Sequence, residues 1–428
     1  MTQPALERVC SIVHQAARTK SRRLILLSGV PGSGKTLVGL QLVHAHFLDD
    51  LAVARNVGKP TAPAVFLSGN APLVEVLQYE LAGAGGDGKA FVRGVKDYLR
   101  TYASKKHAIP PQHVLVFDEA QRAWDADYVA EKHGGLMQSE PELFIELAER
   151  APDWCVVLGL VGSGQEIHMG EEGGLRQWTE AISRSPRRDE WVVHASATVL
   201  SGLGDAEVAQ QCAEELTLTA ELRFHLTRDV HAFVAALVEY GDHARCADLA
   251  RTLEENGYSL RMVRELEVGQ QYLRDRFSND PEARFGIVAS SRDRDLKRFR
   301  VYNDFQSTKR IRVGRWFGAS ETTGGRDSCC SFEQCVTEFQ CQGLELDAAL
   351  VAWGTDLRRV DGEWSIEGAS KYMRKGRASV KDPHRLRVNA YRVLLTRGRN
   401  ATVIFVPQLA ELDETAAFIE LAGFKPLS

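Results

Sequence analysis

The sequence lacks the features that mark membrane-spanning, secreted and low-complexity proteins. No apolar run approaches the roughly 18 residues that cross a membrane as a helix. The N-terminal residues MTQPALERVC lack the charged region and the apolar region of a signal peptide. No repeat with a period of about 20–50 residues and no low-complexity tract occurs. We therefore expect a cytoplasmic protein with no membrane among its partners.

Cysteines with the spacing of a zinc site are also missing. The chain of 428 residues has eight scattered cysteines, four of them in CCSFEQCVTEFQC at 329–341. Their adjacent, five-apart and six-apart spacings differ from the paired Cys-x-x-Cys or Cys/His pattern of structural zinc. Scattered cysteines in a long chain are typical of reduced thiols in the cytosol. A zinc site at 329–341 stays only as the less favoured alternative.

An excess of positive charge is absent as well. The net charge is −4, with 44% hydrophobic and 26% charged residues, which is an ordinary globular balance. Any surface for nucleic acid must therefore be local. The length is about two to three times that of a common domain, so one to three domains are expected and two is the natural first choice.

What the sequence does contain is a series of short apolar runs, each followed by a loop and a helical pattern. Such runs are typical of parallel strands that are buried on both faces, so we predict an α/β fold. The pattern restarts near residue 216, which predicts one unit over 1–215 and a second over 216–428. The runs are RLILLSG (23–29), AVFLSG (64–69), HVLVFDE (113–119), WCVVLGLVG (154–162), ELTLTAELRF (215–224), RFGIVAS (284–290), LDAALVAWG (346–354) and ATVIFVP (401–407).

The stretch GVPGSGKT, residues 29–36, fits the phosphate-loop pattern G-x-x-x-x-G-K-[ST] and follows a predicted strand. Its glycines allow backbone N–H groups to turn toward phosphate, at a helix N-terminus that favours negative charge. We expect Lys35 to reach the β- and γ-phosphates and Thr36 to hold Mg²⁺, so the predicted cofactors are ATP and Mg²⁺. A glycine-rich turn without a ligand is the alternative. The predicted nucleotide-binding residues here are Gly29, Pro31, Gly32, Ser33, Gly34, Lys35 and Thr36.

The stretch VLVFDEAQR, residues 114–122, places two carboxylates after a buried strand. Ligands of open α/β sheets bind at the carboxyl ends of strands. We therefore expect Asp118 to orient the magnesium shell and Glu119 to position or deprotonate the water that attacks the γ-phosphate. The alternative is an exposed acidic pair at a strand end. A kinase would need a second acceptor site, whereas the Asp-Glu pair favours hydrolysis.

Several motifs, in order along nearly the whole chain, resemble those of superfamily-one helicases. The subgroup that they resemble is the Schlafen-type DNA/RNA helicase domain, which shares the GNxPLVxVL-like motif Ia and GxGQxI in motif III. Ser163 and Gly164 stand where most superfamily-one helicases have an Asp before the glutamine. The matching stretches are FLSGNAPLVEVL (66–77, motif Ia), VFDEAQR (116–122, motif II), GLVGSGQEI (159–167, motif III), ELRF (221–224, motif IV), VTEFQCQGLELD (336–347, motif V) and NAYRVLLTRGR (389–399, motif VI).

The resemblance implies two tandem RecA-like P-loop NTPase domains with parallel sheets and an ATP cleft between them. It implies that Gln165 senses the γ-phosphate and that Arg223 and Arg397 contribute from the second domain. Catalysis of phosphoryl transfer rests on positive charge around the γ-phosphate, so arginines that arrive on domain closure would couple hydrolysis to motion. Surface salt bridges are the alternative for both arginines.

By the same resemblance Gly343 lies near the γ-phosphate and Glu345 near the ribose, although Glu345 can equally cap a strand. Gln15 is a weak candidate for the adenine-contacting residue. Motif Ia implies that Ser68 and Asn70 contact a nucleic-acid backbone. Basic clusters at 290–300, 309–318 and 371–385 are further candidates, and in the first of them we single out Arg292 and Arg294. Each cluster by itself is more typical of a solvated face, and the presence of motif Ia in the same chain favours a role for one or two of them.

Two functions are compatible with this set of motifs. The first is an ATP-driven translocase or helicase on single-stranded DNA or RNA. The second is an ATPase switch that senses nucleic acid and regulates a partner such as a nuclease, with antiviral defence as one context; this rests on family analogy. The chain ends soon after motif VI, so we expect such an effector to be a separate protein.

Overall fold

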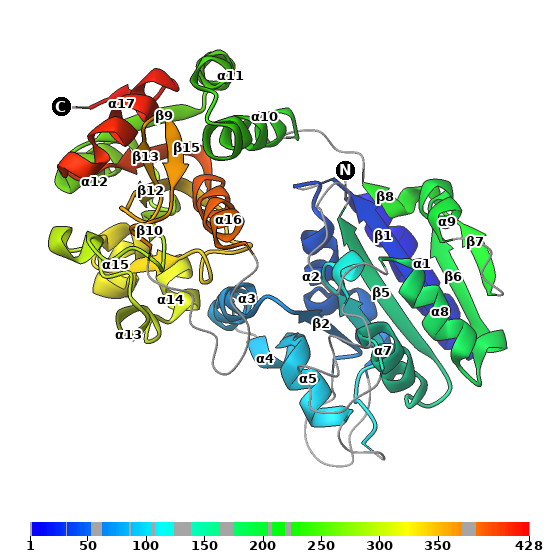
Figure 1. Ribbon diagram of the computed structural model, residues 1–428. Coiled ribbons are helices and arrows are strands. Elements are labelled where there is room, and N and C mark those ends of the chain that lie inside the picture. The colour runs from blue at the N-terminus through cyan, green and yellow to red at the C-terminus, as the bar shows by residue number, and fades with distance from the viewer. Residues whose placement is uncertain are drawn as a thin grey trace, which may run out of the picture. The chain divides into compact units, whose positions relative to one another are not determined.

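The computed structural model describes residues 2–30, 32–52, 62–84, 87–103, 108–123, 138–162, 174–203, 208–218, 224–369 and 382–427. Packing divides the chain into two units, which we describe separately (Figure 1). Unit 1 consists of Met1–Val74 and Ala84–Phe224, and unit 2 consists of Glu75–Gly83 and His225–Ser428. Among the described residues, none of the helices combines the length and apolar character needed to span a bilayer.

The predicted division after residue 215 differs from these units in two respects. The stretch 215–224 was expected to open the second sheet, but Thr217 and Leu218 form strand β8 and pair in parallel with Ser28 and Gly29 of unit 1. That part of the prediction is wrong, because a local apolar pattern does not reveal which sheet a strand joins. Residues 75–83 also group with unit 2, where a Cβ atom on Gly314 would lie 2.5 Å from the Glu75 carbonyl oxygen.

Unit 1 is built on a parallel sheet in the order β3-β2-β4-β5-β1-β6-β7, with β8 beside the end of β1. Strand β5 separates β1 from β4, so the carboxyl ends of these three strands meet at one edge of the sheet. The strands are β1 (Arg22–Gly29), β2 (Ala64–Ser68), β3 (Val92–Gly94), β4 (Val114–Phe117), β5 (Cys155–Gly162), β6 (Trp191–Ala195), β7 (Ala209–Cys212) and β8 (Thr217–Leu218).

The helices of unit 1 cover its sheet through apolar faces. Helix α2 approaches closely because a Cβ on Gly39 would already touch Phe66, Val116 and Leu160 at 2.9–3.1 Å. A hydrophobic core cluster of unit 1 includes Phe144 and Trp178, and both of these side chains are fully buried. The helices are α1 (Gln3–Thr19), α2 (Lys35–His44), α4 (Gly88–Phe91), α5 (Val95–Tyr102), α7 (Glu140–Glu149), α8 (Arg176–Arg184) and α9 (Ala197–Gly202), with short turns η1 (His46–Leu51), η2 (Ala120–Arg122), η3 (Arg188–Glu190) and η4 (Glu214–Leu216). Helix α3 (Ala71–Gly83) begins in unit 1 and belongs to unit 2 from Glu75 onward.

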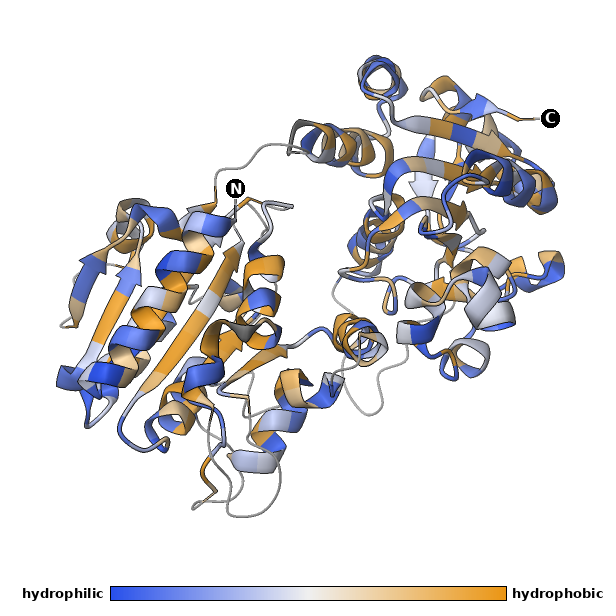
Figure 2. Ribbon diagram, turned by 180° about the vertical axis from the view of Figure 1, so that it is seen from behind, coloured by the Kyte–Doolittle hydropathy of each residue, from blue (hydrophilic) through white to orange (hydrophobic). Residues whose placement is uncertain are grey.

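Unit 2 has a second parallel sheet, in the order β11-β10-β12-β15-β9-β16, and a separate antiparallel hairpin, β13-β14. Figure 2 shows apolar residues along the main strands of both units. The two parallel sheets confirm the predicted α/β class. The strands are β9 (Ser259–Val263), β10 (Phe285–Ala289), β11 (Cys335–Thr337), β12 (Leu346–Ala352), β13 (Arg358–Val360), β14 (Glu363–Ser365), β15 (Gly398–Phe405) and β16 (Lys425–Pro426).

The core of unit 2 contains aromatic residues as well as aliphatic ones. Trp353, Tyr391 and Phe424 all lie in one buried cluster. The helices are α10 (Phe224–Ala235), α11 (His243–Glu255), α12 (Leu266–Arg276), α13 (Phe305–Thr308), α14 (Val313–Gly318), α15 (Glu321–Gly324), α16 (Pro383–Leu395) and α17 (Asp413–Leu421), with shorter turns η5 (Ala236–Tyr240), η6 (Leu296–Phe299), η7 (Gly325–Asp327), η8 (Cys329–Ser331) and η9 (Ala410–Leu412).

Candidate functional site

The phosphate loop, residues 29–36, connects the end of β1 to the start of α2. Gly32 and Gly34 have φ values of 76° and 95°, in the left-handed region that favours glycine. A Cβ on Gly29 would overlap the Ser33 hydroxyl and lie 3.0 Å from the Leu218 Cβ. Gly29 therefore lacks the space for a side chain, whereas Gly32 has open space and is favoured there by its backbone angle alone. Pro31 lies outside the described residues.

Lys35 begins helix α2 and its ammonium group lies back over the loop. Its Nζ donates hydrogen bonds to the carbonyl oxygens of Gly29, at 2.6 Å, and Val30, at 2.9 Å. Burial lowers the pKa of Lys35, while the nearby Glu119 and Asp118 carboxylates raise it. The loop thus contains a partly buried ammonium that can exchange carbonyl oxygens for phosphate oxygens.

Ser33 provides an observation that fits a phosphate ligand. Its side chain is only 5% exposed, and its hydroxyl has no hydrogen-bond partner within the described part of the chain. Buried hydroxyls normally have a partner, since an unsatisfied group costs about 1–3 kcal/mol. An oxygen-rich anion in the loop would satisfy this donor, so the residues present fit the phosphates of a nucleotide.

Asp118 directly follows β4, beside the end of β2. The pairing of Leu67 with Phe117 brings the next residues of both strands together, and Ser68 Oγ donates to Asp118 Oδ2 at 3.1 Å. Both side chains are buried. Burial, followed by the neighbouring Glu119 carboxylate, raises the pKa of Asp118 to about 7. A nearby cation would relieve this unfavourable burial of negative charge.

The donor set at this edge fits Mg²⁺ held together with a nucleotide. Magnesium in such sites takes one or two protein oxygens, several waters and phosphate oxygens. Asp118 supplies a carboxylate, and Thr36 supplies a half-buried hydroxyl in the first turn of α2. Within the described ranges, no three His, Cys, Asp or Glu side chains gather to hold a metal by themselves. A magnesium ion here would therefore depend on the phosphates for further ligands.

Glu119 occupies a strained position that its neighbours maintain. It has φ 56° and ψ 47°, a left-handed conformation that costs a non-glycine residue about 1–3 kcal/mol. Gln121 donates from Nε2 to the Glu119 carboxylate and accepts through Oε1 from the backbone N–H of Gly162, at 2.9 Å. Gln121 therefore connects the carboxylate to the end of β5. Sequence reasoning missed this role, although Gln121 was visible in the motif DEAQ.

Helix α8 supports the same turn through two side-chain hydrogen bonds. Trp178 Nε1 donates to the Ala120 carbonyl oxygen at 2.9 Å, and Gln177 Nε2 donates to that of Ala123 at 3.3 Å. Both donors are buried. The backbone after Glu119 is thus held by side chains from a distant helix, which keeps the carboxylate in place.

Two further predicted phosphate contacts, Gln165 and Arg223, lie outside the described residues, so their roles stay predictions. Gln15 is an exposed residue of α1, and its predicted contact with adenine is untested. Ser68 was predicted to contact nucleic acid, but its side chain is 2% exposed and its hydroxyl is used by Asp118. That burial contradicts a surface role for Ser68. Asn70 is half-buried, and its side chain accepts from Leu73 N.

Arg397 joins motif VI to motif V within unit 2. Its guanidinium donates to the carbonyl oxygens of Val393 and Leu344, both at 2.8 Å. Gly343, one residue before Leu344, has φ 77° and is exposed. Gly343 and Arg397, each of which was predicted to lie near the γ-phosphate, are therefore close to each other, because the Arg397 guanidinium is held against the motif V turn.

The other charged groups of motifs V and VI form ion pairs. Glu345 is exposed and lies 3.3 Å from Arg399, while Arg392 lies 2.7 Å from Glu239. These contacts favour structural roles for Arg392 and Arg399, and they use the carboxylate that was predicted near the ribose. Of the two predicted nucleic-acid contacts after β10, Arg292 is half-buried and Arg294 is exposed.

A comparison with protein families agrees with the motifs of the sequence. A family model described as "Schlafen group 3, DNA/RNA helicase domain" matches residues 22–408. A comparison with curated proteins finds none that matches this chain. Among solved structures, the Pyrococcus furiosus Hef helicase domain is 9% identical, with 96% of this chain and 97% of that chain covered and a TM-score of 0.30. A DEAD box protein from the hyperthermophile Methanococcus jannaschii is 11% identical, with 95% and 88% covered and a TM-score of 0.28.

Proposed function

We propose that this chain, which belongs to the Schlafen group 3 DNA/RNA helicase domain family, hydrolyses ATP with Mg²⁺ and couples hydrolysis to movement on single-stranded DNA or RNA. The observation that carries the ATPase part is the phosphate loop, where a buried hydroxyl on Ser33 has no partner within the described residues and Lys35 covers the loop carbonyls. Both features suit a loop that binds phosphate.

In the proposed reaction the residues of unit 1 have distinct tasks. Lys35 and the loop N–H groups bind the β- and γ-phosphates, and Thr36 and Asp118 hold the metal. Magnesium, when bound, supplies positive charge that neutralises the phosphate oxygens. Glu119 accepts a proton from the attacking water, and Gln121 keeps its carboxylate oriented. Arg397 is proposed to add positive charge on the γ-phosphate side.

The coupling to nucleic acid rests on family membership and on local positive charge in a chain whose net charge is −4. Arg294 is the candidate contact best supported by its surroundings, because it is exposed and forms no ion pair with another described residue. An unpaired arginine can bind a phosphate without first breaking an existing contact. A cytoplasmic location is proposed with this function.

The test is the ATPase rate with and without single-stranded DNA or RNA, followed by displacement of a duplex that carries one overhang. We expect nucleic acid to raise the rate, and the overhang to be required for displacement. A rate that ignores all nucleic acid would remove the motor proposal and leave a simple ATPase. Stimulation without displacement would favour the second candidate, a nucleic-acid-sensing switch that regulates a separate effector such as a nuclease.

A further inference from the structure

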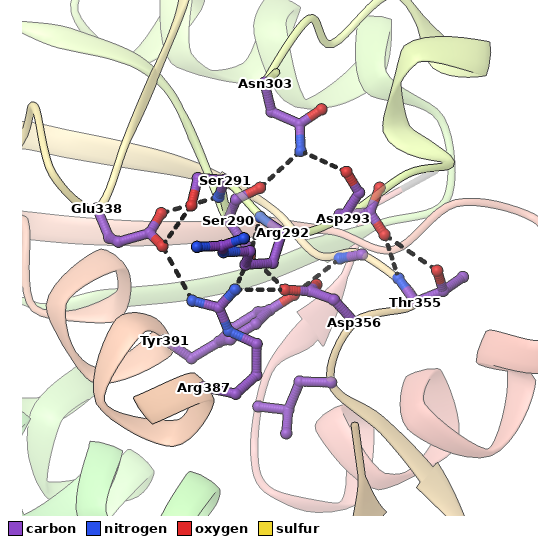
Figure 3. Close-up of polar contacts among 12 residues, drawn as sticks. Ser290, Ser291, Arg292, Asp293, Asn303, Glu338, Thr355, Asp356, Arg387 and Tyr391 are labelled. Carbon is purple, nitrogen blue, oxygen red and sulfur yellow. Dashed lines mark hydrogen bonds and ion pairs between the residues drawn. The ribbon is translucent and has the colours of Figure 1, made fainter. Parts of the chain in front are cut away.

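Three neighbouring strands of unit 2 end in residues that form one buried polar network (Figure 3). Glu338 follows β11, residues 290–295 follow β10, and Asp356 lies after β12. These strands are adjacent and parallel, so their carboxyl ends meet at the same edge of the sheet. We call residues 290–295 the β10 loop. It carries both predicted nucleic-acid contacts of this region, Arg292 and Arg294.

Arg387, from helix α16, connects the three strand ends. Its Nη2 donates to Glu338 Oε1 at 2.9 Å, and its Nη1 donates to Asp356 Oδ2 at 3.1 Å and to Ser290 Oγ at 2.9 Å. Arg387 is 2% exposed and Asp356 is fully buried. One guanidinium thus bridges two carboxylates and the first residue of the β10 loop, as the planar fork of arginine allows.

The same carboxylates determine the path of the loop backbone. Glu338 accepts from both the backbone N–H and the hydroxyl of Ser291, each at 2.8 Å. Ser290 Oγ donates to Asp356 and accepts from the backbone N–H of Arg292, at 3.1 Å. The first three residues of the loop are therefore held by groups that Arg387 orients.

The second half of the loop is held in a similar way. Asp293 accepts from the backbone N–H groups of Asp295 and Leu296 and, through its other oxygen, from Thr355 N at 2.6 Å. Asn303 Nδ2 donates to the carbonyl oxygens of Ser290 and Asp293. The loop contains no glycine, so buried side chains and not backbone freedom define its shape.

Stability alone is a weak explanation for this network. Replacing a buried ion pair by well-packed apolar residues is often neutral or stabilising, because desolvation offsets the Coulomb attraction. A buried network in which both terminal nitrogens of Arg387 are hydrogen-bonded does favour one geometry. The side chain that this geometry presents to solvent is Arg294, which is exposed and has no ion pair within the described residues.

We propose that Arg387 is a positioning residue, which acts through Glu338, Asp356 and Ser290 to hold the β10 loop so that Arg294 meets a phosphate of single-stranded nucleic acid. This inference rests on the proposed function and deepens it, because it assigns to a buried residue a part in nucleic-acid binding. Arg387 itself has no access to the ligand.

The experiment uses Arg387→Lys in the full chain, which keeps the charge but cannot bridge both carboxylates with one planar group. Arg261→Lys is the matched control, since Arg261 pairs with Glu254 at 2.8 Å in the same unit and has no contact with the β10 loop. Binding of a single strand of about 20 nucleotides, as DNA and as RNA, is measured by fluorescence anisotropy across a range of salt concentrations. Thermal unfolding reports whether each variant is folded.

We expect Arg387→Lys to weaken binding about tenfold and to reduce the slope of log affinity against log salt by about 0.7, as the loss of one phosphate contact on a single strand would. Arg294→Ala should have the same two effects. The double variant should bind no more weakly than Arg294→Ala alone, since both changes remove one contact. Arg261→Lys should bind as the unaltered protein does.

Two outcomes would overturn the inference. The first is an affinity of Arg387→Lys for the single strand within about twofold of that of the unaltered protein. The second is a double variant whose loss of binding free energy equals the sum of the losses in the two single variants. If Arg387→Lys does not fold, Glu338→Gln replaces it, because the amide loses one of the acceptors used by Ser291 and Arg387. Failure of the unaltered protein to bind any oligonucleotide is a distinguishable result, which would overturn the proposed coupling and this inference together.

Discussion

The phosphate loop of unit 1 and the β10 loop of unit 2 both follow an inner strand at the carboxyl edge of a parallel sheet, yet they are built differently. The phosphate loop depends on glycines and leaves the Ser33 hydroxyl without a partner among the described residues. The β10 loop has no glycine, and buried side chains bind the backbone N–H groups of Ser291 and Asp295 and the carbonyl oxygen of Ser290. The contrast fits a phosphate loop that a ligand would complete and a β10 loop that its own buried side chains already hold.

The largest expected effect tests the chemistry beside the phosphate loop. Glu119→Gln should lower ATP turnover by about 100-fold or more, since a general base contributes about 10²–10⁴. ATP binding, measured by equilibrium titration, should be retained because the amide keeps the shape of the side chain. Glu180→Gln, at a half-exposed site on α8, is the control. An unchanged turnover would remove Glu119 from the proposed reaction.

The next prediction compares the phosphate loop with the β10 loop by measuring how much one glycine-to-alanine substitution near each loop lowers the free energy of unfolding. Gly354→Ala should lower the free energy of unfolding by about 2 kcal/mol, because the new Cβ would overlap the buried, hydrogen-bonded Asp293. Gly32→Ala has open space and only an unfavourable φ of 76°, so its cost should be about 1 kcal/mol. Urea unfolding measures both.

ATP affinity should show the reverse order, with Gly32→Ala weakened and Gly354→Ala unaffected. Equal unfolding costs for the two variants would contradict the proposed difference between a loop formed in advance and a loop completed by ligand.

Acid should also act in opposite directions on two buried groups, His194 of unit 1 and Asp356 of unit 2. Burial, then Arg23 and Arg8, lowers the pKa of His194 on β6 from 6.5 to about 4. The unfolded chain therefore takes up this proton first, and its contribution to stability is lost as pH falls from about 6.5 toward 4. Between pH 7 and pH 5 the His194 contribution to the free energy of unfolding should fall by about 2 kcal/mol.

Asp356 should respond in the opposite sense. Burial raises the pKa of Asp356 to about 6, so its contribution to the free energy of unfolding grows as pH falls through 6 toward 3.8.

Urea unfolding of His194→Leu at pH 7 and pH 5 tests the first of these effects. The variant should lose less stability on acidification than the unaltered protein does. His384→Leu, at an exposed site, is the control and should keep the full acid sensitivity. An acid response in His194→Leu equal to that of the unaltered protein would show that other groups carry it.

The smallest expected effect concerns the support of Glu119. Gln121→Leu should reduce the turnover number about tenfold, because the carboxylate loses the donor that orients it, while ATP affinity stays within about twofold. Gln3→Leu, on the exposed face of α1, is the control. Equal losses of affinity and turnover would indicate a disturbed phosphate loop instead of a misplaced base.

Strands with strong local patterns were predicted well, and those without were not. The runs that became β1, β4, β5, β12 and β15 are nearly continuous apolar segments, as central parallel strands require. Strands β6 and β9 were missed because WVVHA and SLRMV carry a polar residue near the middle of a short segment. Strand β7, with the sequence AQQC, lacks the apolar run of a buried strand, and all four of its residues are exposed.

The residues of the candidate site likewise fall into those that a contiguous motif predicts and those that it does not. Lys35, Thr36, Asp118 and Glu119 were predictable because the phosphate loop and the strand that ends in Asp-Glu are contiguous stretches. Ser68 was misassigned, because its burial follows from the register between β2 and β4, which no local pattern contains.

The roles of Gln121 and Arg387 depend on contacts between residues far apart along the chain, Gly162 for the first and Ser290 for the second. The sequence by itself determined the α/β class and the family motifs, and it predicted the phosphate loop, since each of these is encoded in short contiguous runs. Only the tertiary structure decided which sheet β8 joins, what holds Glu119 and what holds the β10 loop. The physical reason is that strand pairing brings together side chains whose partners no neighbouring residue specifies.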